Sequence, residues 1–526
     1  MATLNEKKDV DGHDSLVKVV DHIEVADPVD SEPLWHYIKR NRRSVGWSVF
    51  ILSLMVSFGY DALLTGSLIG VPAFKQRFGV YDESANMYIV SAMWQSVWSA
   101  MTYVAMTLGI FITGQVHGRY GVRVTLIAAA VLSVGAIISE QLARNPQQFL
   151  GAKIIAGVSY GLQTATGLMS LHSYAPERLR GPLGTCLNSF ILLGGWLASG
   201  VITGTGQAYL NSSLAYQIPF ALQYMFVLIL IGGIVFIPEA PSWYVRRGEL
   251  DKARASLVKL YGKDQQDAVQ AELEREQTAA EIEHAASTSA PGLLEPLQRK
   301  NLPRTMISSC LFGFQQLVGG SFVTTYLTYF FQVAGAPETI SLNLGMMSFS
   351  VQLLGNIFSF FLIDRLGRRT ILVWGLFSMT VVLIVIGIAW AVRTPASLWV
   401  MVAFMTVWAF LYQASIGAVG YALASEIPSA RLRPATIGIA GPVGQLCALG
   451  MGFATPYMIN PDEGNMGGLV GFVFAGLCAI ATVWAFFCVP ETAGRTRDQI
   501  EALWATKVPV RKWKGYQLDA AGETVA

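Results

Sequence analysis

Residues 118–123 read Gly-Arg-Tyr-Gly-Val-Arg, and residues 364–369, which begin 246 positions later, read Asp-Arg-Leu-Gly-Arg-Arg. A second signature recurs at nearly the same distance. Residues 238–239 are Pro-Glu at the end of an apolar segment, and residues 490–491, 252 positions later, are Pro-Glu at the end of another. The second half of the chain therefore repeats the first. Parallel repeats of this kind are typical of membrane transporters, whose two halves enclose a central site that faces either side by rocking.

The composition also indicates a membrane protein. Hydrophobic residues make up 53% of the chain and charged residues only 14%, and the mean hydropathy is +0.45. Soluble proteins carry about a quarter charged residues. The 51 glycines are expected where helices pack closely in lipid. A net charge of +2 gives no reason to expect a nucleic-acid partner, so the lipid bilayer is the partner that the composition predicts.

Twelve windows of the chain are long and apolar enough to be membrane spans. A helix needs about 20 predominantly apolar residues to cross the hydrocarbon core. The windows are residues 46–69, 92–115, 122–141, 149–172, 183–204, 217–237, 305–331, 342–363, 370–391, 397–424, 436–458 and 467–489. They lack the alternation of barrel strands. The predicted fold class is therefore all-α integral membrane, with twelve transmembrane helices in two six-helix halves.

The loops between these spans predict the orientation. With both termini in the cytosol, the short inner loops hold nine arginines, whereas the outer loops hold four lysines or arginines. Positive residues concentrate in cytosolic loops of membrane proteins. We therefore predict a multi-pass protein with both termini cytosolic. The plasma membrane is its expected location, with the vacuolar membrane as the alternative.

The same windows divide the chain into five regions. These are a disordered polar tail over 1–44, a six-helix half over 45–237, a cytosolic linker over 238–304, a second half over 305–489 and a cytosolic tail over 490–526. The linker is rich in Glu, Lys, Gln and Ala and is predicted to form short helices. They either make a solvated connection or brace a gate. Asn211 begins an Asn-Ser-Ser glycosylation sequon in a short outer loop.

Five short motifs occur in order at the ends of the predicted helices. They are residues 238–243, 315–319, 364–369, 425–427 and 490–495. Over essentially all of residues 45–505 the chain resembles the sugar porters of the major facilitator superfamily. Within that superfamily, residues 326–331 followed by Ala334-Gly335 are more similar to fungal α-glucoside (maltose-type) permeases than to hexose carriers.

The chain also departs from the pattern of that family. Gly118 stands where the first-half loop motif has Asp, and Lys153 stands where the fourth helix has Arg. Gly441-Pro442 occupies the place of an Arg-Asn pair in the eleventh helix of many α-glucoside permeases. The resemblance therefore implies a disaccharide or α-glucoside as substrate, without implying maltose itself.

Asp61 is an ionisable residue inside the first predicted span. Placing such a group in the bilayer costs about 2.5–3.5 kcal/mol on insertion scales, so a functional role is the default interpretation. Asp61 lies about 15 residues into a helix that runs outward, and Lys153 lies near the outer end of a helix that runs inward. The two can meet at a similar depth. A carboxylate beside a cation suits proton coupling, the role that the resemblance also implies; the alternative is a permanent ion pair that holds two helices together.

A sugar site requires amides that bond hydroxyl groups and aromatic rings that cover the apolar side of a pyranose. The candidate substrate-binding residues are Gln315, Gln316, Asn188, Gln352, Asn356, Tyr326, Tyr329, Tyr421 and Trp408. Ordinary helix packing is the alternative for each aromatic residue.

Charged residues at the predicted cytosolic helix ends are candidates for an inner gate, which would hold the inside shut and break as the halves rock. They are Arg119, Arg123, Arg180, Glu239, Asp364, Arg365, Arg368, Arg369, Glu426, Arg433 and Glu491. Plain topology is the alternative, because positive inner loops occur in every membrane protein.

The sequence shows no constellation typical of an enzyme, no phosphate-binding loop and no metal-ligand spacing among its five cysteines, so we predict no catalytic residue, metal or cofactor. The function predicted is import of a sugar, a disaccharide or α-glucoside, by proton symport through alternating access, in a monomer. Two alternatives stay open. One is a carrier of the same fold for another polyhydroxylated or secondary metabolite, including an exporter. The other is a sugar sensor that does not transport.

Overall fold

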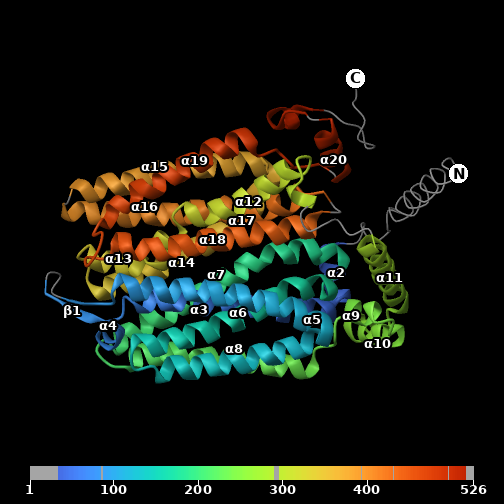
Figure 1. Cartoon of the computed structure of the whole chain (residues 1–526), viewed down its shortest axis with the longest axis horizontal. Coiled ribbons are helices and arrows are strands. Elements are labelled where there is room, and N and C mark those ends of the chain that lie inside the picture. Colours follow the sequence, from blue (N-terminus) through green and yellow to red (C-terminus); the bar gives the residue numbers. More distant parts are fainter. Residues whose placement is uncertain are drawn as a thin grey trace.

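The computed structural model describes residues 33–83, 87–288, 295–392, 394–429, 432–495, 497–506 and 508–516. Most of the predicted tail over 1–44, and the end of the tail over 490–526, lie outside these residues. The long helices run side by side along one axis (Figure 1). At one end lie α4 (Pro72–Phe78), β1 (Val80–Asp82) and β2 (Met87–Ile89), which pair as an antiparallel hairpin. We call this the hairpin end.

The first half is built from five long helices. They are α3 (Arg42–Leu68), preceded by the short α2 (Leu34–Arg40), then α5 (Ala92–Leu142), α6 (Pro146–Tyr174), α7 (Glu177–Ala208) and α8 (Leu214–Phe236). α5 contains two of the predicted spans, because Gly121 breaks it with a left-handed φ of 87° that residues other than glycine rarely adopt. The 118–123 stretch is therefore the turn between two antiparallel helices.

The second half contains two broken spans. Its helices are α12 (Leu302–Leu317), η3 (Ser321–Thr325), α13 (Leu327–Val333), α14 (Glu338–Leu366), α15 (Arg368–Val392), α16 (Pro395–Ala414), α17 (Ile416–Glu426), α18 (Arg433–Ile459), η4 (Gly467–Leu469) and α19 (Val470–Cys488), followed by α20 (Arg497–Ala505) and η5 (Val510–Gly515). The halves meet along α7 with α14 and along α5 with α18. Among the described residues, ten helices are long and apolar enough to cross a membrane. Counting α5 twice and adding α6 gives the twelve that the sequence predicts.

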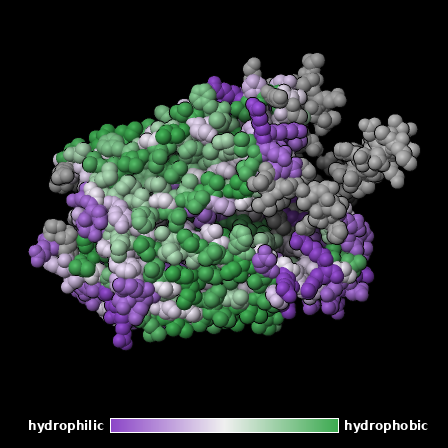
Figure 2. All heavy atoms as spheres, viewed as in Figure 1, coloured by the Kyte–Doolittle hydropathy of each residue, from purple (hydrophilic) through white to green (hydrophobic). Residues whose placement is uncertain are grey.

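The distribution of side chains on the surface agrees with a membrane-spanning bundle. Apolar side chains cover the middle of the molecule, and polar ones gather at its two ends (Figure 2). Phe111 and Phe236, for example, are 76% and 74% exposed. An apolar middle between two polar ends, as on this face, is the surface that a bilayer covers.

Glycines allow the helices of the first half to pack backbone against backbone. A Cβ at Gly194 of α7 would lie 2.1 Å from the carbonyl oxygen of Val56 in α3, and a Cβ at Gly59 would lie 2.0 Å from that of Ile191. Such close approach is how small residues hold helices together in lipid.

The linker forms three helices at the end opposite the hairpin, which we call the linker end (Figure 1). They are α9 (Pro241–Arg246), α10 (Leu250–Tyr261) and α11 (Gln266–Thr288). Leu257, Leu260 and Val269 are buried in the same apolar core as residues of α3. Glu272 of α11 forms an ion pair with Arg180 of α7. These contacts dock α10 and α11 on the first half. The two helices are therefore not a purely solvated connection.

We expect Glu272→Ala to loosen α11. The Glu272 side chain is 7% exposed and that of Arg180 29% exposed, and a partly buried hydrogen bond to a charged group contributes about 1.5–3 kcal/mol. Amide hydrogen exchange along α11 should therefore speed up about tenfold. Glu274→Ala is the matched control, because Glu274 is exposed and its carboxylate accepts a hydrogen bond from Gln270 of the same helix. Equal exchange in the two variants would contradict a docking role for the Arg180–Glu272 pair.

Candidate functional site

The interior of the first half holds a cluster of charged side chains. Nζ of Lys153 in α6 lies 3.2 Å from Oδ2 of Asp61 in α3 and 2.7 Å from Oε1 of Glu140 in α5. The three side chains are 1–2% exposed. Gln223 of α8 donates a hydrogen bond of 3.1 Å to the other oxygen of Glu140. Four helices therefore contribute to a buried site in which two carboxylates share one lysine.

The contact between Asp61 and Lys153 is expected from the sequence, whereas that of Glu140 with Lys153 is not. Glu140 lies two residues before the end of α5, where a charged residue is usually read as belonging to a loop. One feature of the sequence could have indicated the contact between Glu140 and Lys153. The loop over 143–145 returns the chain as an antiparallel helix, and Lys153 is two turns into that helix. A carboxylate and a lysine on the two arms of so short a hairpin are able to meet inside the membrane.

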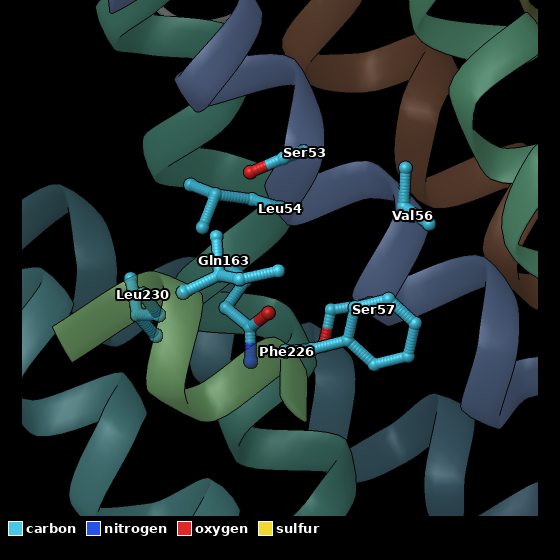
Figure 3. A pocket seen from close by; sticks show the side chains of 8 residues that line it. Ser53, Leu54, Val56, Ser57, Gln163, Phe226 and Leu230 are labelled. Carbon is cyan, nitrogen blue, oxygen red and sulfur yellow. The ribbon is translucent and has the colours of Figure 1, made fainter. Parts of the chain in front are cut away.

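A cavity of about 180 Å³ lies beside this cluster, between α3, α6 and α8 (Figure 3). Ser57, one turn before Asp61, lines it, as does Phe226, one turn after Gln223. Both helices place these residues on the linker-end side of the cluster. Gln163 of α6 also lines the cavity; its amide N–H groups donate to Ser133 and Ser159, while its Oε1 has no hydrogen-bond partner among the described residues.

Several candidate substrate-binding residues are instead committed to packing in the second half. Gln315 is buried and donates a hydrogen bond of 3.0 Å to the carbonyl oxygen of Ile416. That bond satisfies a backbone group where α16 ends and α17 begins. Trp408 is fully buried and stacks on Tyr412, with the ring centroids 5.0 Å apart. Tyr329 is also buried. In this conformation none of these three side chains reaches a solvent-accessible space.

Other candidates join the two halves. Asn188 of α7 donates a hydrogen bond of 3.0 Å to Gln413 of α16. Asn356 of α14 is buried and accepts a hydrogen bond from Ser189. The hydroxyl of Tyr326 lies 3.1 Å from that of Ser99 in α5. These contacts place the three candidates at the interface where alternating access requires bonds to be exchanged.

The remaining candidates differ in how exposed their side chains are. Tyr421 is 49% exposed, although α17 contacts α7, α12 and α18. Its ring meets Phe312 edge-on at 5.4 Å. Gln316 is partly exposed, whereas Gln352 is buried and donates only a long 3.5 Å bond to Ser348. Tyr421, Gln316 and the partly exposed Asn188 are therefore the candidates that a bound molecule could contact directly in this conformation.

Contacts between the halves close the hairpin end. Lys75 of α4 is 3% exposed at its side chain and lies 3.7 Å from Glu338 of α14. It also donates a hydrogen bond of 3.0 Å to Gln332, which in turn bonds the carbonyl oxygen of Gly70. Nearby, Gln95 of α5 bonds Asn460 across the interface. The exposed Asn211 lies in the loop between α7 and α8 at this end.

At the linker end, two glutamates cap two equivalent turns within their own halves. Glu239 accepts hydrogen bonds from the backbone N–H groups of Val122 and Arg123, next to Gly121. Glu491 accepts from the N–H groups of Arg368 and Arg369, next to Gly367, which has a φ of 86°. The repeated sequence thus produces the same capped turn twice.

The other gate candidates either bond residues of their own half or are at least partly exposed. Arg368 lies 3.6 Å from Glu426 in its own half, and Arg369 bonds the carbonyl oxygen of Phe486. Arg119 and Arg365 are exposed and Arg433 is partly buried. The side chain of Asp364 lies outside the part of the chain that the structure describes. The pairs of Arg180, Arg368 and Glu239 named above do not join the second half to the first half or to its linker.

Comparisons with known proteins agree with this architecture. The family model described as "Sugar (and other) transporter" matches residues 47–504. The general alpha-glucoside permease of Saccharomyces cerevisiae is 30% identical over 481 residues, which cover 91% of this chain and 78% of that protein. A maltose permease of the same yeast is 28% identical over 491 residues, covering 93% of this chain and 80% of the relative.

Solved structures show the same fold. The xylose transporter XylE from E. coli, in a partially occluded inward-open conformation, gives a TM-score of 0.70 at 20% identity and covers 85% of this chain and 98% of its own. A proton:xylose symporter structure gives 0.67 at 23% identity and covers 88% and 99%. The predicted fold class and resemblance are confirmed. The chain is a membrane transporter with the major facilitator fold and belongs to the sugar (and other) transporter family.

Proposed function

We propose that this transporter imports an α-glucoside together with a proton, across the plasma membrane, by alternating access. The observation that carries the coupled mechanism is the buried contact between Asp61 and Lys153. The relatives named as alpha-glucoside and maltose permeases support the substrate class. The linker end is taken as cytosolic, in keeping with the positive residues of its loops.

The geometry supports coupling because Asp61 is held in a dry site beside a single lysine. An ionised carboxylate there is stable only while Lys153 faces it, whereas a protonated one does not need the lysine. Loading a proton from outside and releasing it inside therefore changes how tightly α3 is held to α6. Since α3 also packs closely on α7, which meets the second half along α14, this change can reach the interface between the halves.

The substrate is proposed to bind between the halves, beside the exposed Tyr421. Its ring offers an apolar face to a pyranose, and Gln316 and Asn188 offer amide donors and acceptors to hydroxyl groups. The contacts at the hairpin end would break for uptake from outside. The charges at the linker end would then pair across the halves and close the inner side.

The test is uptake of labelled maltose, glucose and a β-linked disaccharide into cells that lack their own sugar carriers, with and without a protonophore. We expect maltose or another α-glucoside to accumulate and the accumulation to collapse with the protonophore. Accumulation that survives the protonophore would contradict proton coupling. Failure of every sugar to enter, in cells with the protein at their surface, would contradict sugar import.

A further inference from the structure

Lys153 has two carboxylate partners, and the contact with Glu140, at 2.7 Å, is shorter than the contact with Asp61, at 3.2 Å. We propose that Glu140 is a second proton-binding carboxylate of the coupling site, which holds Lys153 whenever Asp61 carries the proton. The inference rests on the proposed function, because it assigns a residue to the same proton movement. It adds a group from α5 that neither the sequence motifs nor the family resemblance assigns.

Counting charges supports this role. With both carboxylates ionised, Asp61, Glu140 and Lys153 carry a net charge of −1 in a site that is 1–2% exposed. An uncompensated charge in such a site costs several kcal/mol. One proton shared by the two carboxylates makes the cluster neutral, and two carboxylates that interact closely titrate as a pair. The cluster is therefore built to hold one proton in this conformation.

A second carboxylate also solves a problem that one pair alone would create. If Asp61 were the only partner, its protonation would leave the Lys153 ammonium buried without a counter-charge. Glu140 supplies that counter-charge from a different helix. Gln223 keeps Glu140 in place by donating to the oxygen that does not contact Lys153. Lys153 thus keeps one ionised partner whichever carboxylate is protonated.

The groups that face Glu140 do not provide another cation. Tyr160 and Lys153 come from α6, Asp61 from α3, and Tyr224 from α8. Lys153 is the one cation in this set, and both tyrosines are neutral at physiological pH. The charge of Glu140 is therefore balanced by Lys153 alone among the described neighbours.

The cavity of Figure 3 gives the cluster a neighbouring space on the linker-end side. It begins one turn from Asp61, at Ser57, and one turn from Gln223, at Phe226. Its volume of about 180 Å³ exceeds what a single water molecule requires. Gln163 and Ser57 are two polar residues among those that line it.

The decisive variant is Glu140→Gln, which keeps the shape of the side chain and removes its charge. In it, Asp61 faces Lys153 without competition, so its ionised form is favoured and a proton binds only from a more acidic medium. We expect the pH of half-maximal accumulation to move to more acidic values by about one unit or more. Sugar exchange at equal concentrations on both sides, which needs no net proton movement, should persist. The measurement is accumulation and exchange in reconstituted vesicles over a range of external pH.

Glu140→Asp tests the effect of the carboxylate charge separately from the effect of side-chain length. The shorter side chain keeps the charge but draws it back from Lys153, so the proposal expects an acid shift smaller than that of Glu140→Gln. A purely structural role predicts the reverse order, with the isosteric Gln variant close to wild type and the Asp variant impaired at every pH. If the Gln variant does not reach the membrane, Glu140→Asp decides alone: an unshifted profile with slower exchange overturns the proposal.

Measurements on the wild-type protein distinguish a failure of the proposed symport from a failure of the proposed role of Glu140. If its sugar accumulation does not respond to a proton gradient, the proposed symport itself is wrong. If wild type is coupled and Glu140→Gln keeps the same pH profile, symport stands and the role of Glu140 is overturned.

Discussion

Asp61→Asn abolishes accumulation of the transported sugar and leaves equal exchange of sugar in place: this is the largest functional effect that we expect. An asparagine cannot bind and release a proton, and Glu140 then faces Lys153 without competition and stays ionised, so the transmembrane proton gradient no longer drives uptake. Moving one charge through 100 mV is worth about 2.3 kcal/mol, and each 1.4 kcal/mol is a factor of ten. The loss is therefore about 50-fold in the accumulation ratio at 100 mV with no pH difference.

The measurement is the steady-state ratio of labelled sugar inside and outside reconstituted vesicles under an imposed potential. Asp462→Asn serves as the matched control, because this exposed aspartate follows α18 and lies outside the buried cluster. It should keep the wild-type ratio. Undiminished accumulation in Asp61→Asn would falsify the coupling role and leave the ion pair with Lys153 as a structural contact between α3 and α6.

The largest effect on stability is expected from Gly194→Ala. The added methyl group would lie 2.1 Å from the carbonyl oxygen of Val56 and 2.7 Å from the backbone nitrogen of Tyr60. Both atoms belong to the backbone of α3, so no side chain can turn away to make room. Forcing the two helices apart costs about 1–3 kcal/mol or more. It also displaces α3 next to Asp61, so coupling should suffer with stability.

Gly204→Ala tests the same substitution on the same helix without the clash. No atom lies within 4 Å of the Cβ that would be added at Gly204. Because alanine favours a helix over glycine by about 1 kcal/mol, this variant should be at least as stable as wild type. The measurement is thermal unfolding of the purified protein in detergent. An equal melting temperature for the two variants would show that α3 and α7 do not pack as closely as described.

Much of the fold could be predicted from the sequence, because hydrophobic length alone determines where a chain crosses a bilayer. The window 46–69 corresponds to α3, and 149–172 lies within α6. The breaks inside spans could not be predicted in this way. The window 397–424 is divided at Ser415, and the carbonyl oxygen of the next residue, Ile416, accepts a hydrogen bond from Gln315, a residue about 100 positions away. Only tertiary contacts show that this amide serves the backbone.

The candidate site was harder to predict than the fold. An ionisable residue in an apolar window, such as Asp61, stands out in any sequence. Glu140 does not, because its position near a helix end is compatible with solvent until α8 is seen to cover it. Trp408 and Tyr421 are both aromatic residues of one apolar stretch. Only the packing shows that Trp408 is fully buried while Tyr421 is 49% exposed.

The buried cluster belongs to one half only, so the two repeated halves are not interchangeable. The capped turns at Gly121 and Gly367 are alike in both halves. The six predicted spans over 305–489, however, contain no Asp, Glu, Lys or Arg. Handling of ions inside the membrane is thus assigned to one half, and a mutation that exchanged equivalent positions between the halves would not be neutral.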